Sequence, residues 1–479
     1  MSKKIEEWIE TNREKFIKIS DKIWSYAEIG LLEEKSSKFL ADTLEEAKFK
    51  VEREVADMPT AFIASYGTGK PVIAILGEFD ALPGLSQVAE PVKKPMKEGA
   101  PGHGCGHNLF GAACLAACMA VKKVIETGEV KGTIRFYGCP AEENADAKGW
   151  MVRAGLFDDV DISLTWHPAD LNSIIAFNFQ AIYSVLFKFH GRSAHAAGDP
   201  FNGRSALDAV ELMNVGCNYL REHITPDARI HYVITNGGEA PNVVPAEAEV
   251  WYFIRAPLLD QMKEIYPRVV KVAKGAALMT ETEVEIDFLG GSANLLPNIT
   301  LEELLFEKMK KVGPPPFSEE DQEFAREIRK TFSQDYFDNF LAWLPKDMRE
   351  FVEQLRDVNL CNVTVPILGR GHTIGGSTDV GDVSWVTPTA QFTSACFTIG
   401  TPGHSWQSVA HAGMSIGHKG MLNAAKILAL AAIELMQKPE LREKARKEFE
   451  EKIKKTPYEC SIPDDAKPPI EYIKKLYNK

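Results

Sequence analysis

Cysteine is sparse in this chain, and its spacing is irregular. Eight Cys among 479 residues do not form the dense framework that holds small secreted domains together through disulfides. This usage indicates free or metal-bound thiols and a reducing compartment. Residues 1–10 carry charges where a secretory signal needs an apolar core, and the apolar stretch 427–435 is too short to span a bilayer. We therefore expect a cytoplasmic protein with no membrane partner.

Positive charge is also in short supply, since the formal net charge is -12. A nucleic-acid partner normally requires a basic face, so this balance argues against one. With 45% hydrophobic and 25% charged residues, the chain is long enough for two or three globular domains with sizeable cores.

A glycine-rich segment, residues 102–108, reads Gly-His-Gly-Cys-Gly-His-Asn. It places Cys105 and His107 two residues apart, so that a thiolate and an imidazole can reach one metal site. The alternative is a glycine turn before a helix, with an incidental Cys and His.

Polar side chains that follow other apolar runs favour the metal hypothesis. Each lies where a buried parallel strand is expected to end. They are Asp80 after residues 72–77, Glu142 and Glu143 after 133–137, His167 at the end of 162–167, and His404 after 396–399. Ligands of open α/β sheets bind beyond the carboxyl ends of the strands, so these side chains are expected to converge there.

The order of the expected elements indicates an α/β fold with an inserted domain. Residues 1–184 alternate strands and helices, as a helix-covered, mostly parallel sheet requires. Residues 185–295 have the order β-α-β-β-α-β of a ferredoxin-like module. Residues 296–479 are expected to return to the first sheet through a strand before His404, with a helical insertion at about 301–357 and a Pro-rich tail that follows the surface.

The candidate ligands are more numerous than one catalytic metal with an open position takes. They are Cys105, His107, Glu143, His167 and His404. Two adjacent metal ions fit better, because a pair can polarise a carbonyl and generate hydroxide from a shared water. Glu142 is then free to take the proton of that water and pass it to a leaving amine. The alternative for this Glu-Glu pair is a solvated surface turn.

Seven segments, in order and spanning nearly the whole chain, carry a family resemblance. They are residues 77–82, 102–108, 137–143, 165–168, 191–197, 241–246 and 377–385. In them the chain resembles the M20 metallopeptidase and aminoacylase family, and within it the amidohydrolase subgroup. The resemblance implies that the five candidate ligands hold two divalent ions, Mn²⁺ or Zn²⁺, with Glu142 as general base and acid. It also implies that the inserted module is a lid and dimerisation domain, so we expect a homodimer or a pairing with a related second subunit.

The resemblance extends to residues outside the ligand set, with two departures. In several relatives the histidine matching His195 reaches across the dimer and stabilises the tetrahedral oxyanion; the alternative is a polar residue in a surface loop. Many members have His-x-Asp where this chain has Glu78-Phe79-Asp80, and the subgroup usually has Asp where this chain has Asn108. We expect Asp80 to orient a metal ligand by a hydrogen bond, and we assign no role to Glu78.

The expected substrate is a small N-acyl or N-aroyl amino acid, such as p-aminobenzoyl-glutamate. Four residues are candidates for binding it: Asn242, Arg255, Ser377 and Asp379. Arg255 suits bidentate carboxylate binding, although an exposed strand charge is the alternative. Three aromatic residues are expected to line the cleft around the acyl group: Phe79, Trp166 and Trp406.

Two other functions compete with this one. A branch of the same subgroup consists of dipeptidases that act on β-alanyl or other short dipeptides. A non-catalytic metal-binding protein is an alternative from a different class, and the presence of Glu142 disfavours it.

Overall fold

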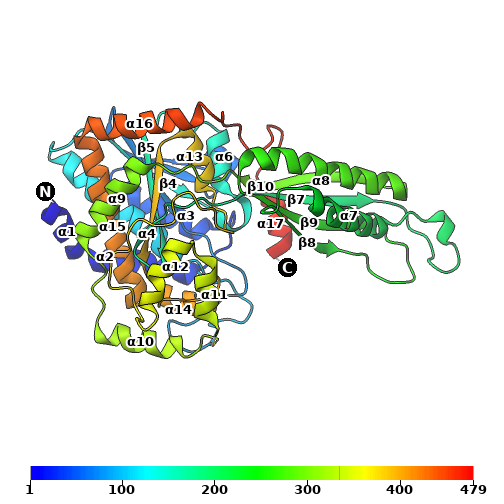
Figure 1. The fold of residues 1–479 in the computed structure, drawn as a ribbon, viewed down its shortest axis with the longest axis horizontal. Coiled ribbons are helices and arrows are strands. Elements are labelled where there is room, and N and C mark those ends of the chain that lie inside the picture. The colour runs from blue at the N-terminus through cyan, green and yellow to red at the C-terminus, as the bar shows by residue number, and fades with distance from the viewer. Residues whose placement is uncertain (1, 334, 478–479) are drawn as a thin grey trace.

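A seven-stranded sheet forms the centre of the larger part of the molecule (Figure 1) in the computed structural model, which describes residues 2–333 and 335–477. Its strands, in spatial order, are β1 (Lys50–Arg53), β2 (Phe62–Thr68), β4 (Gly132–Cys139), β3 (Val72–Glu78), β5 (Ile162–Ala169), β11 (Thr389–Ala395) and β6 (Ser173–Ile174). The four strands β4, β3, β5 and β11 are parallel, and the strands toward both edges pair antiparallel. The predicted α/β class with a mostly parallel central sheet is confirmed.

Helices cover both faces of this sheet, as its apolar strands require. Every residue of β3 is buried, which is typical of a parallel strand between two helical layers. One layer contains α1 (Ser2–Thr11), α2 (Arg13–Tyr26), α4 (His107–Glu126), α9 (Ile299–Val312) and α15 (Ser415–Gln437). The other contains α6 (Ala147–Arg153) and α13 (Val380–Val386). Cys114 and Cys118 of α4 are fully buried in the core.

The helices α4 and α15 are long and apolar enough to cross a membrane by length and composition alone. In this fold, however, 89% and 83% of their most apolar windows are buried inside the protein. Both are therefore core helices, and α4 packs closely because Ala113, Ala116 and Ala117 leave room for its neighbours.

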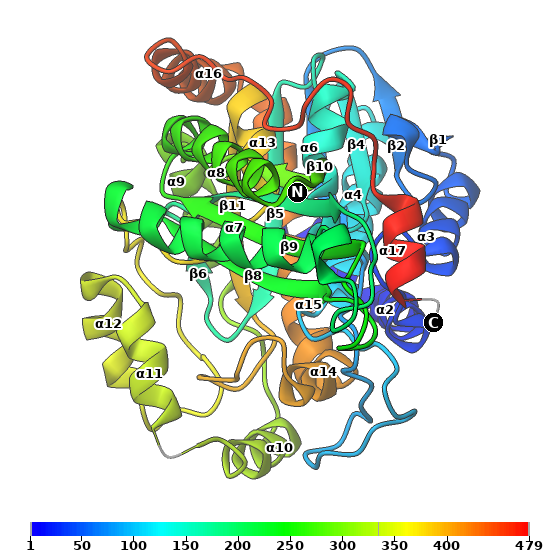
Figure 2. The ribbon, with the colours of Figure 1, turned by 90° about the vertical axis from the view of Figure 1, so that its right-hand side faces the viewer.

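Residues 181–292 form a second, four-stranded antiparallel sheet that projects from the side of the first (Figure 1). We call these residues the module. Its strands, in spatial order, are β10 (Glu283–Ser292), β7 (Ala181–His190), β9 (Glu247–Ala256) and β8 (Arg229–Asn236). Two helices, α7 (Ala206–Leu220) and α8 (Leu259–Thr280), cover one face, which gives the order β-α-β-β-α-β. Figure 2 shows both helices in front of the sheet.

The strands of the module alternate between its two faces. In β9, Val250, Tyr252 and Ile254 are buried against the helices, whereas Phe253 and Arg255 face the other way. This alternation decides which side chains the module presents to the rest of the molecule.

The helical region after the module consists of two sets of helices. Leu301, Leu305 and Met309 of α9 are buried in the main core, so this helix belongs to the larger part of the molecule. The remaining helices, at the lower edge in Figure 1, are α10 (Glu319–Arg329), α11 (Tyr336–Trp343) and α12 (Lys346–Val352). Leu341 of α11 and Met348 and Val352 of α12 are buried in the second core cluster of the larger part, so the helical insertion expected at about 301–357 stays a prediction.

The strand expected at residues 396–399 lies earlier in the chain. β11 ends at Ala395, and the amide groups of Cys396 and Phe397 both donate to the Ala169 carbonyl at the end of β5, at 2.7 and 3.1 Å. The apolar run 396–399 is buried, but it leaves the sheet as a loop toward His404. Burial without strand pairing explains why its composition resembles that of a strand.

The C-terminal residues contact both the larger part of the molecule and the module. After α16 (Pro439–Ile453), the Tyr458 hydroxyl donates to Asp382 at 2.6 Å. The chain ends in α17 (Ile470–Tyr477), where Tyr472 lies edge-on to Trp251 of the module with ring centroids 6.1 Å apart. The sequence patterns of the Pro-rich tail do not predict this short final helix.

Candidate metal centre and substrate cavity

The five predicted ligands converge at the carboxyl ends of the parallel strands. Cys105 lies in the loop before α4, and His107 is the first residue of that helix. Glu143 lies in the short helix α5 (Glu142–Ala145) directly after β4, and His167 is in the last part of β5. His404 comes from the loop after β11. Residues from four chain segments therefore meet at one place.

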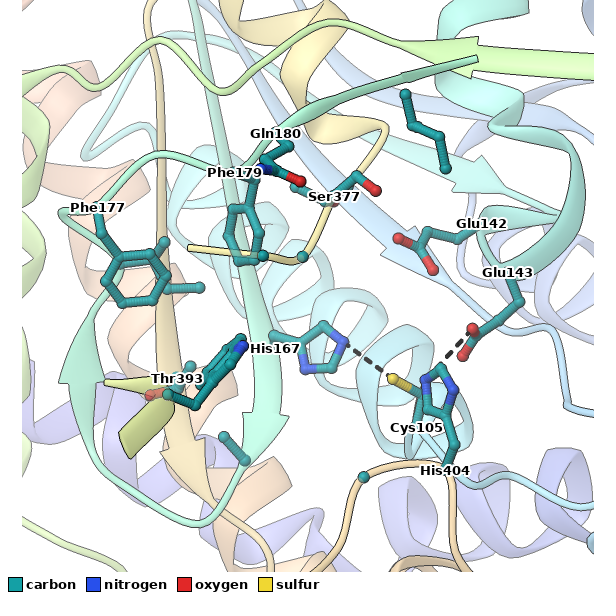
Figure 3. A pocket seen from close by; sticks show the side chains of 18 of the residues that line it. Cys105, Glu142, Glu143, His167, Phe177, Phe179, Gln180, Ser377, Thr393 and His404 are labelled. Carbon is teal, nitrogen blue, oxygen red and sulfur yellow. Dashed lines mark hydrogen bonds and ion pairs between the residues drawn. The ribbon is translucent and has the colours of Figure 1, made fainter. Parts of the chain in front are cut away.

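The ligand atoms are close enough to share metal ions. Cys105 Sγ is 3.4 Å from His167 Nε2, and His404 Nε2 is 3.5 Å from Glu143 Oε2 (Figure 3). Three groups have ligand atoms that all lie within 4.8 Å of one another: Cys105–His107–His167, Cys105–Glu143–His404, and Glu78–His107–Glu142. Cys105 and His107 each belong to two of them, so the three groups adjoin one another.

Buried atoms of the cluster that make no hydrogen bond fit a bound cation. Glu78 Oε2, His107 Nε2 and Glu143 Oε1 are buried and make no hydrogen bond among the described residues, although Glu78 Oε2 and His107 Nε2 face each other at 3.2 Å. Buried polar atoms are nearly always hydrogen-bonded, so this facing pair and Glu143 Oε1 fit a bound cation. A set of thiolate, imidazole and carboxylate donors suits zinc or manganese.

Asp80 and Pro168 fix the orientation of two imidazoles. His107 Nδ1 is 2.7 Å from Asp80 Oδ1, and the other Asp80 oxygen accepts the Glu143 amide at 2.9 Å. His167 Nδ1 donates to the Pro168 carbonyl at 2.7 Å. Each histidine thus uses Nδ1 for a fixed partner and leaves Nε2 for the cluster.

Burial and crowding of acidic groups set the proton affinities here. Burial, reinforced by Glu78 and Glu143, raises the pKa of Glu142 well above its ordinary value. Burial, together with Glu143, likewise raises the pKa of the Cys105 thiol. A divalent cation supplies the positive charge that offsets this cost, as metal sites generally do.

Backbone strain marks the same region. Three non-glycine residues around the cluster have left-handed backbone: Ala141 (φ 53°), Asp146 (φ 50°) and His404 (φ 51°). Such residues concentrate at functional sites, where surrounding contacts hold them in a costly conformation.

Lys148 is a part of the site that the sequence does not indicate. Its Nζ atom is 2.6 Å from Glu78 Oε1 and 2.6 Å from Asp379 Oδ1, and all three side chains are buried. The Lys148 amide also donates to Asp379 at 2.9 Å. Asp379, expected to bind the substrate, does not line the cavity described below, because its carboxylate is fully buried and bound to Lys148. In the sequence, Lys148 is a single lysine after an acidic pair, and nothing distinguishes it from a lysine on the protein surface.

A cavity of about 980 Å³ opens over the cluster and contacts Cys105, Glu142, Glu143, His167 and His404. One wall is apolar and consists of Phe177, Phe179, Phe340, Trp343, Leu344 and Met348. Figure 3 shows Phe177 and Phe179 across the cavity from the two glutamates. The module supplies another wall, on which Arg255 Nη1 donates to Ser377 Oγ at 2.5 Å. Two predicted binding residues, Arg255 and Ser377, thus line the cavity.

The three aromatic residues expected around the substrate do not line the cavity. Phe79 and Trp166 are fully buried in the main core, where the Trp166 indole donates to the Phe110 carbonyl at 3.2 Å. Trp166 precedes His167 on β5, so strand alternation points it away from the cluster. Trp406, at the start of α14 (Trp406–Ala412), does not line the cavity either.

His195 and Asn242 lie together but away from the cavity of their own chain. Both are exposed in loops of the module, and the Ala196 amide donates to the Asn242 carbonyl at 3.0 Å. Neither residue lines the cavity. Asn108, the other departure from the expected pattern, donates to Ser20 and to the Ala412 carbonyl, at 2.9 Å each. It therefore joins helices rather than facing the metal cluster.

Comparisons with known proteins agree with this geometry. The sequence profile of Peptidase family M20/M25/M40 matches residues 74–432. The chain is 45% identical to one of the subunits of the p-aminobenzoyl-glutamate hydrolase of Escherichia coli (strain K12), over 97% of this chain and 98% of that protein. It is 28% identical to the Xaa-Arg dipeptidase of Mus musculus, over 95% and 93% of the two chains. Among solved structures, the Bacillus subtilis YXEP protein, a dinuclear metal binding peptidase from the M20 family, has a similar fold, with a TM-score of 0.55, 17% identity, and coverage of 89% and 99%.

Proposed function

The chain belongs to Peptidase family M20/M25/M40 and is an amide-bond hydrolase, and from this premise we propose that it cleaves an N-aroyl amino acid such as p-aminobenzoyl-glutamate. The observation that carries the proposal is the cavity itself. It joins the ligand cluster to an apolar, aromatic wall on one side and to Arg255 on another. An aromatic acyl group and a free carboxylate match these two walls.

Two divalent ions, Mn²⁺ or Zn²⁺, are the proposed cofactors. Cys105, His107, Glu143, His167 and His404 would hold them. When bound, such a pair polarises the scissile carbonyl and lowers the pKa of an attacking water. The buried atoms of the cluster that make no hydrogen bond support this assignment.

Glu142 is the proposed general base and acid. It lines the cavity beside the ligand Glu143 and is not needed among the five ligands. Its carboxylate takes the proton from the attacking water and delivers it to the leaving nitrogen.

The remaining residues position these groups. Asp80 holds the imidazole of His107 and the backbone of Glu143 at the same time. Arg255, with Ser377, binds the α-carboxylate of the leaving amino acid and so fixes the carbonyl over the metals.

The active site is proposed to be completed by a second subunit. His195 of the partner subunit would stabilise the oxyanion, with Asn242 beside it. The exposed edge strand β8, with Val233 54% and Ile234 40% exposed, supports association through the module. The proposed second subunit is another copy of this chain or a related chain. The cytoplasmic location stays a prediction.

A dipeptidase is the second candidate, because the chain is similar to the Xaa-Arg dipeptidase over most of its length. Kinetics on three substrates separate the two functions: p-aminobenzoyl-glutamate, its α-amide, and β-alanyl-lysine. The measurement is released amine from protein loaded with Mn²⁺ or Zn²⁺, alongside metal analysis.

We expect about two ions per chain and the highest kcat/KM on the free acid. Equal kcat/KM on the free acid and its α-amide would exclude the proposed role of the α-carboxylate in anchoring the substrate. A preference for the dipeptide would favour the second candidate, and no hydrolysis by metal-loaded protein would favour a non-catalytic metal-binding role.

A further inference from the structure

Two cross-strand rows of side chains form the wall that the module presents to the cavity. Ile182 of β7, Arg255 of β9 and Arg229 of β8 lie opposite one another and make the first row. The second row consists of Ser184, Phe253 and His231. All six residues line the cavity. The wall therefore carries two guanidinium groups as direct neighbours, with an imidazole beside them.

Neither arginine has a carboxylate partner. Among the described residues, no Asp or Glu oxygen lies within 4.0 Å of the Arg229 or Arg255 side-chain nitrogens. Arg255 Nη1 donates to Ser377, while its Nε atom is buried and unpaired. Arg229 Nη1 donates to the carbonyls of Pro226 and Ala228, at 2.7 and 2.8 Å, which holds its head group in place. The Arg229 side chain is exposed and that of Arg255 is partly buried, so only Arg255 bears a burial cost that a bound anion would offset.

Acidic groups line the same cavity, but they have other roles. Glu142 and Glu143 belong to the proposed catalytic cluster, and the partly buried Asp170 accepts the Gly400 amide at 2.8 Å. Burial raises the pKa of Asp146, although Arg255 opposes this shift. The positive charge of the arginine pair is therefore not neutralised from the opposite wall by an ion pair.

We infer that Arg229 is a specificity-determining residue that, beside Arg255, recognises the side-chain carboxylate of the leaving amino acid. This inference rests on the proposed function, in which Arg255 takes the α-carboxylate, and adds Arg229 as the residue that takes the side-chain carboxylate. Directly opposed residues of an antiparallel pair have Cβ atoms about 4.5–5.5 Å apart, which suits two carboxylates on one short chain. Guanidinium groups bind carboxylates in a fixed bidentate geometry.

The same pair selects against basic leaving groups. An arginine or lysine side chain placed beside Arg229 brings like charges together in a partly enclosed cavity, and this repulsion is a specificity device. The chain is then expected to differ in preference from the Xaa-Arg dipeptidase to which it is similar.

The test compares p-aminobenzoyl-glutamate with p-aminobenzoyl-glutamine, which differ only in the charge of the side chain. Hydrogen bonds to charged groups are strong enough that the wild-type protein should prefer the glutamate compound by about 10- to 100-fold in kcat/KM. In Arg229→Gln this ratio should fall to about twofold or less, and Arg229→Lys should keep part of it.

The matched control is Arg268→Gln. Arg268 is also in the module, on α8, where it donates to the His223 carbonyl at 2.7 Å and does not line the cavity. This variant should keep the wild-type ratio. A wild-type ratio near one, with both compounds hydrolysed, would overturn the role of Arg229 and leave the proposed function intact. Hydrolysis of neither compound by metal-loaded protein would overturn both.

Discussion

The orientation of a few side chains decides which atoms are free to bind metal. Asp80 and the Pro168 carbonyl occupy Nδ1 of His107 and His167, so that both Nε2 atoms remain for the cluster. Cys105 is near both halves of the cluster, beside His167 on one side and in one ligand group with Glu143 on the other. The thiol is therefore one of the two residues, with His107, that adjoining ligand groups share.

Cys105→Ser should lower metal content clearly below two ions per chain, because a hydroxyl is a much poorer ligand than a thiolate for these ions. Metal occupancy should also become less sensitive to thiol-blocking reagents. Metal analysis after dialysis measures both effects. Cys460→Ser is the matched control, because Cys460 lies outside the cluster and should not change the metal content. Full stoichiometry in Cys105→Ser would exclude Cys105 as a ligand.

Among the elements, α6 connects the metal cluster to the loop before α13. Lys148 makes this connection through its two buried carboxylate partners, Glu78 at the end of β3 and Asp379 beside α13. Burial opposes its charge, but Asp379 and Glu78 outweigh burial and raise the pKa of Lys148. The charged lysine thus fixes Glu78 against His107, whose Nε2 lies 3.2 Å from Glu78 Oε2.

Lys148→Met should lower the free energy of unfolding of the metal-free protein by about 3–5 kcal/mol, because it leaves two buried carboxylates without their cation. Urea unfolding of the chelator-treated protein measures this change without a contribution from metal binding. Lys123→Met, which removes an exposed ion pair with Glu126, should cost about 0–1 kcal/mol. Similar losses in the two variants would mean that the buried network does not stabilise the fold as described.

Sequence patterns predict the strands that are buried on both faces and the elements whose buried and exposed residues alternate regularly. The apolar runs of β3, β4 and β5 are buried on both sides, and the alternation in residues 181–292 predicts the order of the module's elements. Predictions of the side of an element on which a side chain lies, or of the residue that it contacts, are less successful. The aromatics Phe79 and Trp166 are on the core side, and the buried Asp379 is bound to Lys148. Arg229 gives no signal in the sequence, because only the register of β8 against β9 places it beside Arg255.

In the whole molecule, the module extends to one side (Figure 1), and two predicted site residues in it, His195 and Asn242, do not line the cavity of their own chain. His195 and Asn242 are exposed at loops that flank each other. The cavity of a single chain is therefore not lined by all the residues that the family resemblance assigns to the site, and the proposed second subunit would supply the others.

Mixing Glu142→Gln subunits with His195→Ala subunits should restore activity to a pair of inactive proteins. In a hybrid dimer, one of the two sites has both Glu142 and the partner subunit's His195. Activity should rise as subunits exchange, toward about a quarter of the wild-type value at random mixing of equal amounts, since half of the dimers are hybrids with one intact site. Subunit exchange demonstrated by mass, without recovery of activity, would show that His195 does not act across a dimer.

The central claim is that Glu142 moves a proton over a metal pair held by its neighbours, and Glu142→Gln tests this most directly. The variant keeps the size and shape of the side chain but cannot act as a base. It should retain the wild-type metal content, about two ions per chain, while kcat on p-aminobenzoyl-glutamate falls by about 100-fold or more. Near-normal hydrolysis by the metal-loaded variant would contradict the account.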